Sequence, residues 1–289
     1  MIRPPVDLSA HINHDVVRGH PADFPVALRP VFIPKEDGFQ PVLHRRAVVR
    51  EDNGAPLAVV SDRYTLVPHQ RILDLVEEAI RPLAVGPVPR GVFVDRGGAR
   101  MRALFKFPAL AQPVLREDIC PCLKVQNTYD GTSRVAVHIG AFHFVCTNLA
   151  VGGGGVFAGG FMSVHAGEVA IEKVAEQLAS FLKGFDAIVD LYRAWSEERL
   201  GTNGLDVILD ELPKRFAKLL EERIHMALAA TVFEAYNLAT YYATHETRSY
   251  RTAFELLARV NRAFQKHAPR PQHILPAPSP KPDRHAVLA

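Results

Sequence analysis

Cysteine and long apolar runs are both scarce in this sequence. The chain has 3 cysteines among its 289 residues. So small and odd a number does not suit the disulfide framework of a secreted protein, so we expect free thiols in a reducing compartment. No apolar run approaches the roughly 18 residues that a membrane span requires, and the N-terminus lacks the basic-then-apolar layout of a secretory signal. The sequence therefore predicts a cytoplasmic protein with no membrane partner.

The excess of charge of one sign is also small. The formal net charge is +3, which permits an anionic partner but does not require one. Hydrophobic residues make up 48% of the chain, enough for a sizeable buried core. Any case for nucleic-acid binding therefore depends on where the cations lie.

The start of the chain is punctuated by prolines and then turns to strand-like sequence. The prolines predict an extended arm with little regular structure over residues 1–40. Runs rich in β-branched residues at 44–50 and 57–61 flank Asn53-Gly54, a dipeptide that favours a tight hairpin turn. An amphipathic helix is predicted between Pro68 and Pro82.

Two further strand pairs have a basic face. One joins 91–95 to 100–107 through Gly97-Gly98, and the other joins 119–126 to 133–139 through Tyr129-Asp130-Gly131. Side chains alternate along a strand, so Met101, Ala103, Phe105 and Phe107 are predicted to face the core. The opposite parity carries Arg100, Arg102 and Lys106. Lys124 shares a parity with Gln126, and Arg134 with His138, so the sheet has a polar, basic surface if these faces point the same way as that of Arg100.

After a glycine-rich stretch at 152–160 the sequence becomes helical. Apolar residues from Ile171 to Trp195 recur at spacings of three and four, which predicts one helix about 45 Å long. Its apolar stripe is covered by the sheet, by a second subunit, or by both. Further helices are predicted at 205–220, 224–245 and 250–264. The fold class is α+β, with antiparallel hairpins packed on a long helix. Four regions are predicted: an arm at 1–40, a core at 41–200, a helical region at 201–267 and a disordered Pro-rich tail at 268–289.

The residues give little support for catalysis, a metal or a cofactor. Cys120, Cys122, His143 and Cys146 are the ligand types of a zinc site, but their spacing matches no zinc ribbon, so no metal is predicted. A thiol at Cys146 needs a nearby base, which the sequence does not supply. We therefore expect no catalytic residue and no cofactor; an enzyme would require Asp130, Cys146 and Asn148 to converge.

The basic strand face carries the functional interpretation. Phosphates would be contacted by Arg96, Arg100, Arg102, Lys106, Lys124 and Arg134, and Tyr129 would stack on a base. The alternative is an ordinary solvated sheet face.

Three short motifs resemble a known family. They are Ser61, Asp62, Arg63 and Tyr64; Asn127, Asp130 and Gly131; and Cys146, Thr147 and Asn148. In order and spacing they are similar to the domain of unknown function 932 family of phage- and plasmid-like proteins. Thr128-Tyr129 departs from the serine-histidine pair expected before Asp-Gly. The resemblance implies a mobile-element setting and leaves the activity open.

Two functions remain in view. The layout of hairpins and a long helix resembles Rad52-like single-strand annealing proteins, at the level of the fold. We therefore expect an oligomeric protein that binds single-stranded DNA for annealing or recombination. The alternative is a non-enzymatic factor that binds a host or plasmid protein, in maintenance or anti-defence, through the helical region and the tail.

Overall fold

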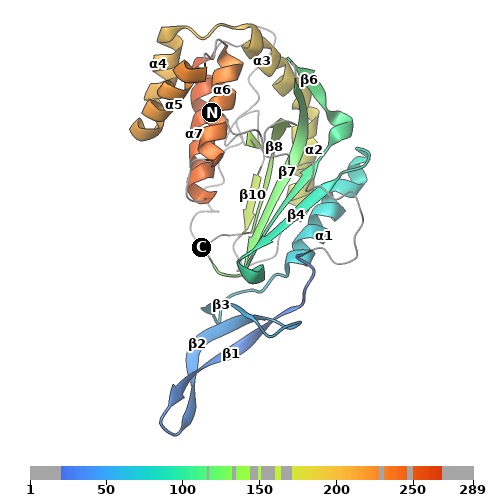
Figure 1. Cartoon of the computed structure of the whole chain (residues 1–289). Helices are drawn as coiled ribbons and strands as arrows, with labels where there is room; N and C mark the ends of the chain where they lie inside the picture. Colours follow the sequence, from blue (N-terminus) through green and yellow to red (C-terminus); the bar gives the residue numbers. More distant parts are fainter. Residues whose placement is uncertain are drawn as a thin grey trace.

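The computed structural model describes residues 21–115, 117–131, 135–143, 149–150, 160–163, 171–227, 231–245 and 250–268. Within these ranges a small antiparallel sheet projects from one end of a body that holds a larger antiparallel sheet and the helices (Figure 1). The α+β class is confirmed. The predicted tail beyond residue 268 lies outside the described residues, and the predicted domain boundaries stay predictions.

The small sheet has three strands in the order β1-β2-β3. They are β1 (Val26–Lys35), β2 (Gly38–Arg50) and β3 (Pro56–Ser61). The hairpin predicted at Asn53-Gly54 joins β2 to β3, with the side chain of Asn53 accepting from Ala55 N at 2.9 Å. The expectation of little regular structure before residue 40 is wrong for residues 26–40. Prolines are tolerated in β1 because it is an edge strand, where a missing N–H costs no ladder bond.

The large sheet has seven strands, five of them in the order β10-β8-β7-β5-β4, with β6 paired to β7 and β9 paired to β8. The strands are β4 (Arg90–Asp95), β5 (Arg100–Lys106), β6 (Gln112–Val114), β7 (Glu117–Thr128), β8 (Val135–His143), β9 (Leu149–Ala150) and β10 (Gly160–Ser163). Antiparallel pairing of β4 with β5 and of β7 with β8 confirms both predicted strand pairs.

The apolar face of the large sheet is covered by helices α1 (His69–Ile80) and α2 (Ile171–Lys183), which also contact each other. Met101, Ala103 and Phe105 are buried on this face, as their alternation predicts. Ile72, Leu73 and Val76 of α1 belong to the same core. Short 3₁₀ turns occur at Arg81–Leu83, Arg96–Gly98 and Pro108–Leu110.

The predicted long helix is in fact two helices. Gly184, at φ −92° and ψ 0°, separates α2 from α3 (Phe185–Glu197). The apolar stripe is nevertheless buried through the break, as Phe181 and Phe185 show. α2 packs on β8 and β10, whereas α3 packs on β6 and on a later helix, α6. The sheet therefore covers only part of the stripe.

The C-terminal helices are α4 (Thr202–Asp210), α5 (Lys214–Ala227), α6 (Val232–His245) and α7 (Tyr250–His267). The helix predicted at 205–220 is divided at Pro213, which cannot donate a backbone hydrogen bond. A cluster of aromatic rings fastens α3 to α6 and α7; it consists of Tyr192, Trp195, Phe233, Tyr236 and Phe264.

Candidate functional site

The cations of the large sheet share one face, as predicted. Arg102 pairs with Gln126 and Leu104 with Lys124 across β5 and β7, so the even-numbered residues of both strands point the same way. Carboxylates neutralise several of these charges. Arg100 Nε donates to Asp130 Oδ2 at 2.7 Å, Arg102 donates to Asp95 at 3.0 Å, and an Arg96 nitrogen lies 3.7 Å from Asp130.

The lysines of this face are withdrawn from solvent. Lys106 is only 9% exposed, and desolvation lowers its pKa. Burial, with the nearby charge of Arg102, lowers the pKa of Lys124 to about 8. Its cross-strand neighbour His138 is buried as well, and desolvation lowers its pKa to about 3. The face is therefore not an open cationic surface. Arg134 lies outside the described residues.

Tyr129, predicted to stack on a base, is 0% exposed. Its hydroxyl accepts the backbone N–H of His69 at 2.8 Å, and its ring stacks on the His69 ring with centroids 4.0 Å apart. Tyr64 of the first motif is half-buried and donates to Thr128 O at 3.1 Å. A ring buried in this way has no free surface for a base.

These residues form a polar joint between the large sheet, the start of α1 and the segment that precedes it. His69 Nε2 donates to Gly98 O at 2.9 Å, so Nδ1 is left to accept from the Asn127 side chain at 3.0 Å. Asn127 also donates to Val67 O at 2.9 Å. Gly131, at φ +66°, supplies the left-handed turn residue after Asp130. In the described residues, the second motif and Tyr64 thus hold the fold together.

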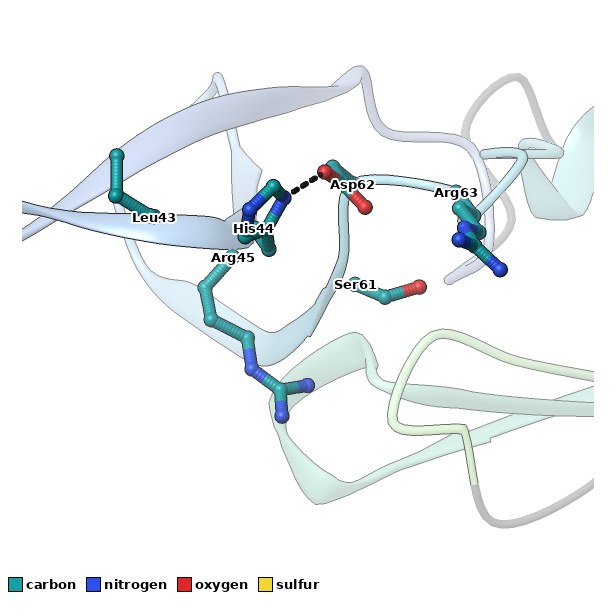
Figure 2. Close-up of a pocket in the computed structure, with 6 residues that line it drawn as sticks. All are labelled: Leu43, His44, Arg45, Ser61, Asp62 and Arg63. Carbon is teal, nitrogen blue, oxygen red and sulfur yellow. Dashed lines mark hydrogen bonds and ion pairs between the residues drawn. The ribbon is translucent and has the colours of Figure 1, made fainter.

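The first motif opens onto a different feature, a hollow of about 730 Å³ on the small sheet (Figure 2). It is lined by Leu43, His44, Arg45, Ser61, Asp62 and Arg63. The pairing of β1 with β2 is irregular between Pro30 and Phe32, and His44 has a left-handed φ of 59°. This bulge turns His44 toward the end of β3, where Nδ1 lies 2.8 Å from Asp62 Oδ2. The His44 side chain, then Arg63, lowers the pKa of Asp62.

The hollow is cationic and does not form a hydrolytic triad. The Ser61 hydroxyl points away from the His44 ring in Figure 2, so this imidazole does not take its proton. Arg45, Arg46 and Arg63 are exposed, and within the described part of the chain no salt bridge engages them. The sequence carried a signal for this surface in the run His44-Arg45-Arg46, which alternation along predicted strands did not single out.

Large apolar side chains of the β1–β2 hairpin are also exposed to solvent. Phe39 is 78% and Leu43 77% exposed, and Phe32 and Ile33 are about half exposed. Exposed apolar clusters on a protein surface mark contact sites more often than scattered single residues do. We call Phe39, Leu43, His44, Arg45, Arg46 and Arg63 the hairpin surface.

The cysteines give no metal or nucleophile in the described residues. Cys120 and Cys122 are buried. Desolvation raises the pKa of Cys120 to about 11 and raises the pKa of Cys122 well above its ordinary value, which disfavours the thiolate at both positions. Among the residues with described positions, no group of three or more histidine, cysteine or acidic side chains is placed to hold a metal ion. The side chain of His143, together with Cys146, Thr147 and Asn148, falls outside them, so the convergence of Asp130, Cys146 and Asn148 that an enzyme would require is not tested.

The comparison with protein families identifies the class to which this fold and these motifs belong. A model described as a domain of unknown function (DUF932) matches residues 56–285, and the chain belongs to that family. Neither the curated proteins nor the solved structures contain a match. In the described ranges, no helix is both long and apolar enough to cross a membrane.

Proposed function

We propose that the protein binds single-stranded DNA through the hairpin surface, as an annealing or recombination factor of a mobile element. The observation that carries the proposal is the pair of exposed arginines, Arg45 and Arg63, that line a hollow with no matching set of carboxylates. Asp62 is the one acid of its lining, and it pairs with His44. This surface replaces the predicted sheet face, whose charges are paired or withdrawn from solvent.

Arginine suits this role for physical reasons. The guanidinium stays charged at any physiological pH and offers a planar fork of donors to a phosphate. Each phosphate contact on a single strand releases counterions and adds roughly −0.7 to the slope of log affinity against log salt. Two contacts from Arg45 and Arg63 give a slope of about −1.4, or roughly a sevenfold loss of affinity from 50 to 200 mM salt.

The exposed apolar side chains favour single strands over duplex. Bases of a duplex are stacked on each other, whereas those of a single strand are free to stack on an aromatic ring, at about 1–3 kcal/mol per base. Phe39 presents an exposed ring on the same hairpin, and Phe32 lies across the hairpin from it on the same face, because Phe32 pairs with Pro41 and Pro34 with Phe39. The hairpin therefore offers both exposed charge and exposed rings for stacking.

Fluorescence anisotropy of labelled single- and double-stranded oligonucleotides across a salt series tests the proposal. Arg45→Gln/Arg63→Gln should weaken single-strand binding and flatten the slope by about 1.4, since two contacts are removed. Lys214→Gln/Arg215→Gln is the matched control, because both side chains are exposed on α5 and the net charge changes equally. Equal losses in the two variants, or a flat salt response of the wild type, would contradict the proposal.

A second candidate is a non-enzymatic factor that binds a host or plasmid protein. The exposed Phe32, Ile33 and Phe39 favour it, since a protein partner buries such side chains. Under this reading, folded wild-type protein binds neither oligonucleotide, and Phe39→Ser abolishes capture of a protein partner.

In the anisotropy assay, an RNA strand of the same sequence as the DNA shows which of the two nucleic acids the protein prefers.

A further inference from the structure

The outer side of α7 carries three cations on one stripe. Arg259, Arg262 and Lys266 follow one another at spacings of three and four residues, which places them along one side of a helix. The opposite side is buried through Leu256, Leu257, Val260, Ala263 and Phe264. Packing thus fixes the rotation of α7 and holds the cations outward.

These cations line a hollow of about 300 Å³ together with Glu211, just beyond the end of α4. Glu211 Oε1 lies 2.5 Å from Lys266 Nζ and 3.1 Å from His267 Nε2. Hydrogen bonds from Lys266, then from His267, lower the pKa of this carboxyl, so it is ionised and its charge is already matched. The Glu211 carboxylate therefore mainly holds the Lys266 ammonium at the edge of the hollow.

The two arginines of the hollow have no such partner. Arg259 and Arg262 are exposed, and throughout the ranges with described positions neither makes a salt bridge. Two guanidinium groups and an ammonium around one carboxylate leave an excess of positive charge in a concave space. A single carboxylate already shared by Lys266 and His267 does not offset it.

We propose that this hollow binds a phosphate group. Guanidinium forks match phosphate oxygens in pairs, and Lys266 adds a point charge. The volume is at the lower end of the range for small-ligand sites, which suits a phosphate-bearing molecule of modest size. The phosphate comes either from a small free phosphate ester or from the backbone of a nucleic-acid strand. α7 and the β1–β2 hairpin lie at opposite ends of the molecule (Figure 1), so this site is independent of the proposed function of the hairpin surface.

Isothermal titration of the full chain with inorganic pyrophosphate tests the site. We expect Arg259→Gln/Arg262→Gln to weaken binding roughly tenfold or more, because two charge-assisted contacts are lost. Lys214→Gln/Arg215→Gln, which removes the same charge from exposed positions on α5, should bind as the wild type does. Circular dichroism verifies that both variants are folded. Absence of binding by the wild type at millimolar pyrophosphate, or equal weakening in both variants, overturns the proposal.

Competition then assigns the source of the phosphate. A thymidine oligonucleotide without terminal phosphate groups offers only backbone diesters. Displacement of pyrophosphate by this strand, equal in the wild type and in Arg45→Gln/Arg63→Gln, supports a nucleic-acid backbone at α7. Displacement by adenosine monophosphate and not by the strand supports a small free ester. Failure of both competitors against a bound pyrophosphate overturns a phosphate-ester site.

Discussion

Single buried polar side chains decide how the start of α1 is held against the large sheet. His69 and Tyr129 are fully buried, and each of their polar contacts crosses from one part of the chain to another. A buried donor without an acceptor costs the desolvation energy of that group. The joint therefore tolerates little change, although it presents no surface to a ligand.

Tyr129→Phe should destabilise the protein by about 1–3 kcal/mol, because the His69 backbone N–H loses its acceptor while the ring still fills its place. Urea denaturation followed by circular dichroism measures the change in the free energy of unfolding. Tyr242→Phe on α6 is the control and should cost less than about 0.5 kcal/mol, because no hydrogen bond to its hydroxyl occurs in the described residues and the ring keeps its contact with Arg223. A joint that contributes nothing would give the two variants the same stability.

His138 makes stability depend on pH. Its folded pKa is about 3, against an ordinary value near 6.5, so the unfolded chain binds the proton more readily. Stability is therefore complete above about pH 6.5 and is lost as the pH falls toward 3, by about 2 kcal/mol between pH 7 and pH 5. His138→Gln should remove this part of the pH dependence, whereas His44→Gln, at an exposed site, should keep it. Urea midpoints at the two pH values give the comparison.

Among the elements, the tight turn between β4 and β5 brings the large sheet against the small one. Gly98 has a φ of +113°, and a Cβ there would lie 2.7 Å from Phe24 Cζ. Arg50 of β2 sits over the Phe24 ring at 3.9 Å and donates to Gly97 O at 3.2 Å. The glycine pair thus makes the turn and allows the close approach of the two sheets.

Gly98→Ala should be destabilising by more than Gly97→Ala. Both positions have positive φ, so both variants are strained, at about 1 kcal/mol or more. Only at Gly98 must Phe24 also move, since nothing lies within 4 Å of a Cβ at Gly97. Thermal unfolding of the two variants isolates the contact with Phe24. A larger loss of stability in Gly97→Ala than in Gly98→Ala would show that the two sheets are not in tight contact at Gly98.

The elements that the sequence predicted well depend on local signals. The hairpins follow from Asn53-Gly54 and Gly97-Gly98, and the buried face of β5 from alternation. The errors arise where tertiary contacts, and not local sequence, determine the secondary structure. β1 forms despite its prolines because β2 pairs with it. The apolar stripe continues through Gly184 because each of the two helices finds its own partner, so the periodicity did not reveal the break.

For the candidate site, the sequence showed which cations share a face but not how they are neutralised. The parity of Arg102 and Lys124 was predicted, whereas the pairing of Arg102 with Asp95 across the β4–β5 hairpin and the desolvation of Lys124 depend on how the side chains pack in the folded sheet. At the hairpin surface, by contrast, the sequence did not show that the cations lie together. Arg45 and Arg63 come together only because the bulge at His44 meets the end of β3.

Across the whole molecule, positive charge is distributed unevenly. The sheet face is paired or desolvated, while arginines without described partners stand on the projecting hairpin and on α7, at the two ends (Figure 1). Although the net charge is only +3, positive charge is concentrated at two places on the surface.

Removing the exposed apolar side chains should leave the fold intact. Phe39→Ser/Leu43→Ser should change the free energy of unfolding by less than about 0.5 kcal/mol per site, because neither side chain is buried. Phe105→Ala, at a side chain 1% exposed, should cost about 3–5 kcal/mol. Denaturant titration measures both. A large loss in the first variant would mean that another part of the chain covers the hairpin surface.

The small sheet has its own apolar cluster of Phe24, Val48, Val60 and Tyr129, separate from the main core. The family match begins at Pro56, the first residue of β3, so the β1–β2 hairpin lies outside it. A protrusion with a separate interior can be lengthened, shortened or exchanged while the body keeps its packing. We therefore expect relatives to diverge most in this hairpin, and to differ there in what they recognise.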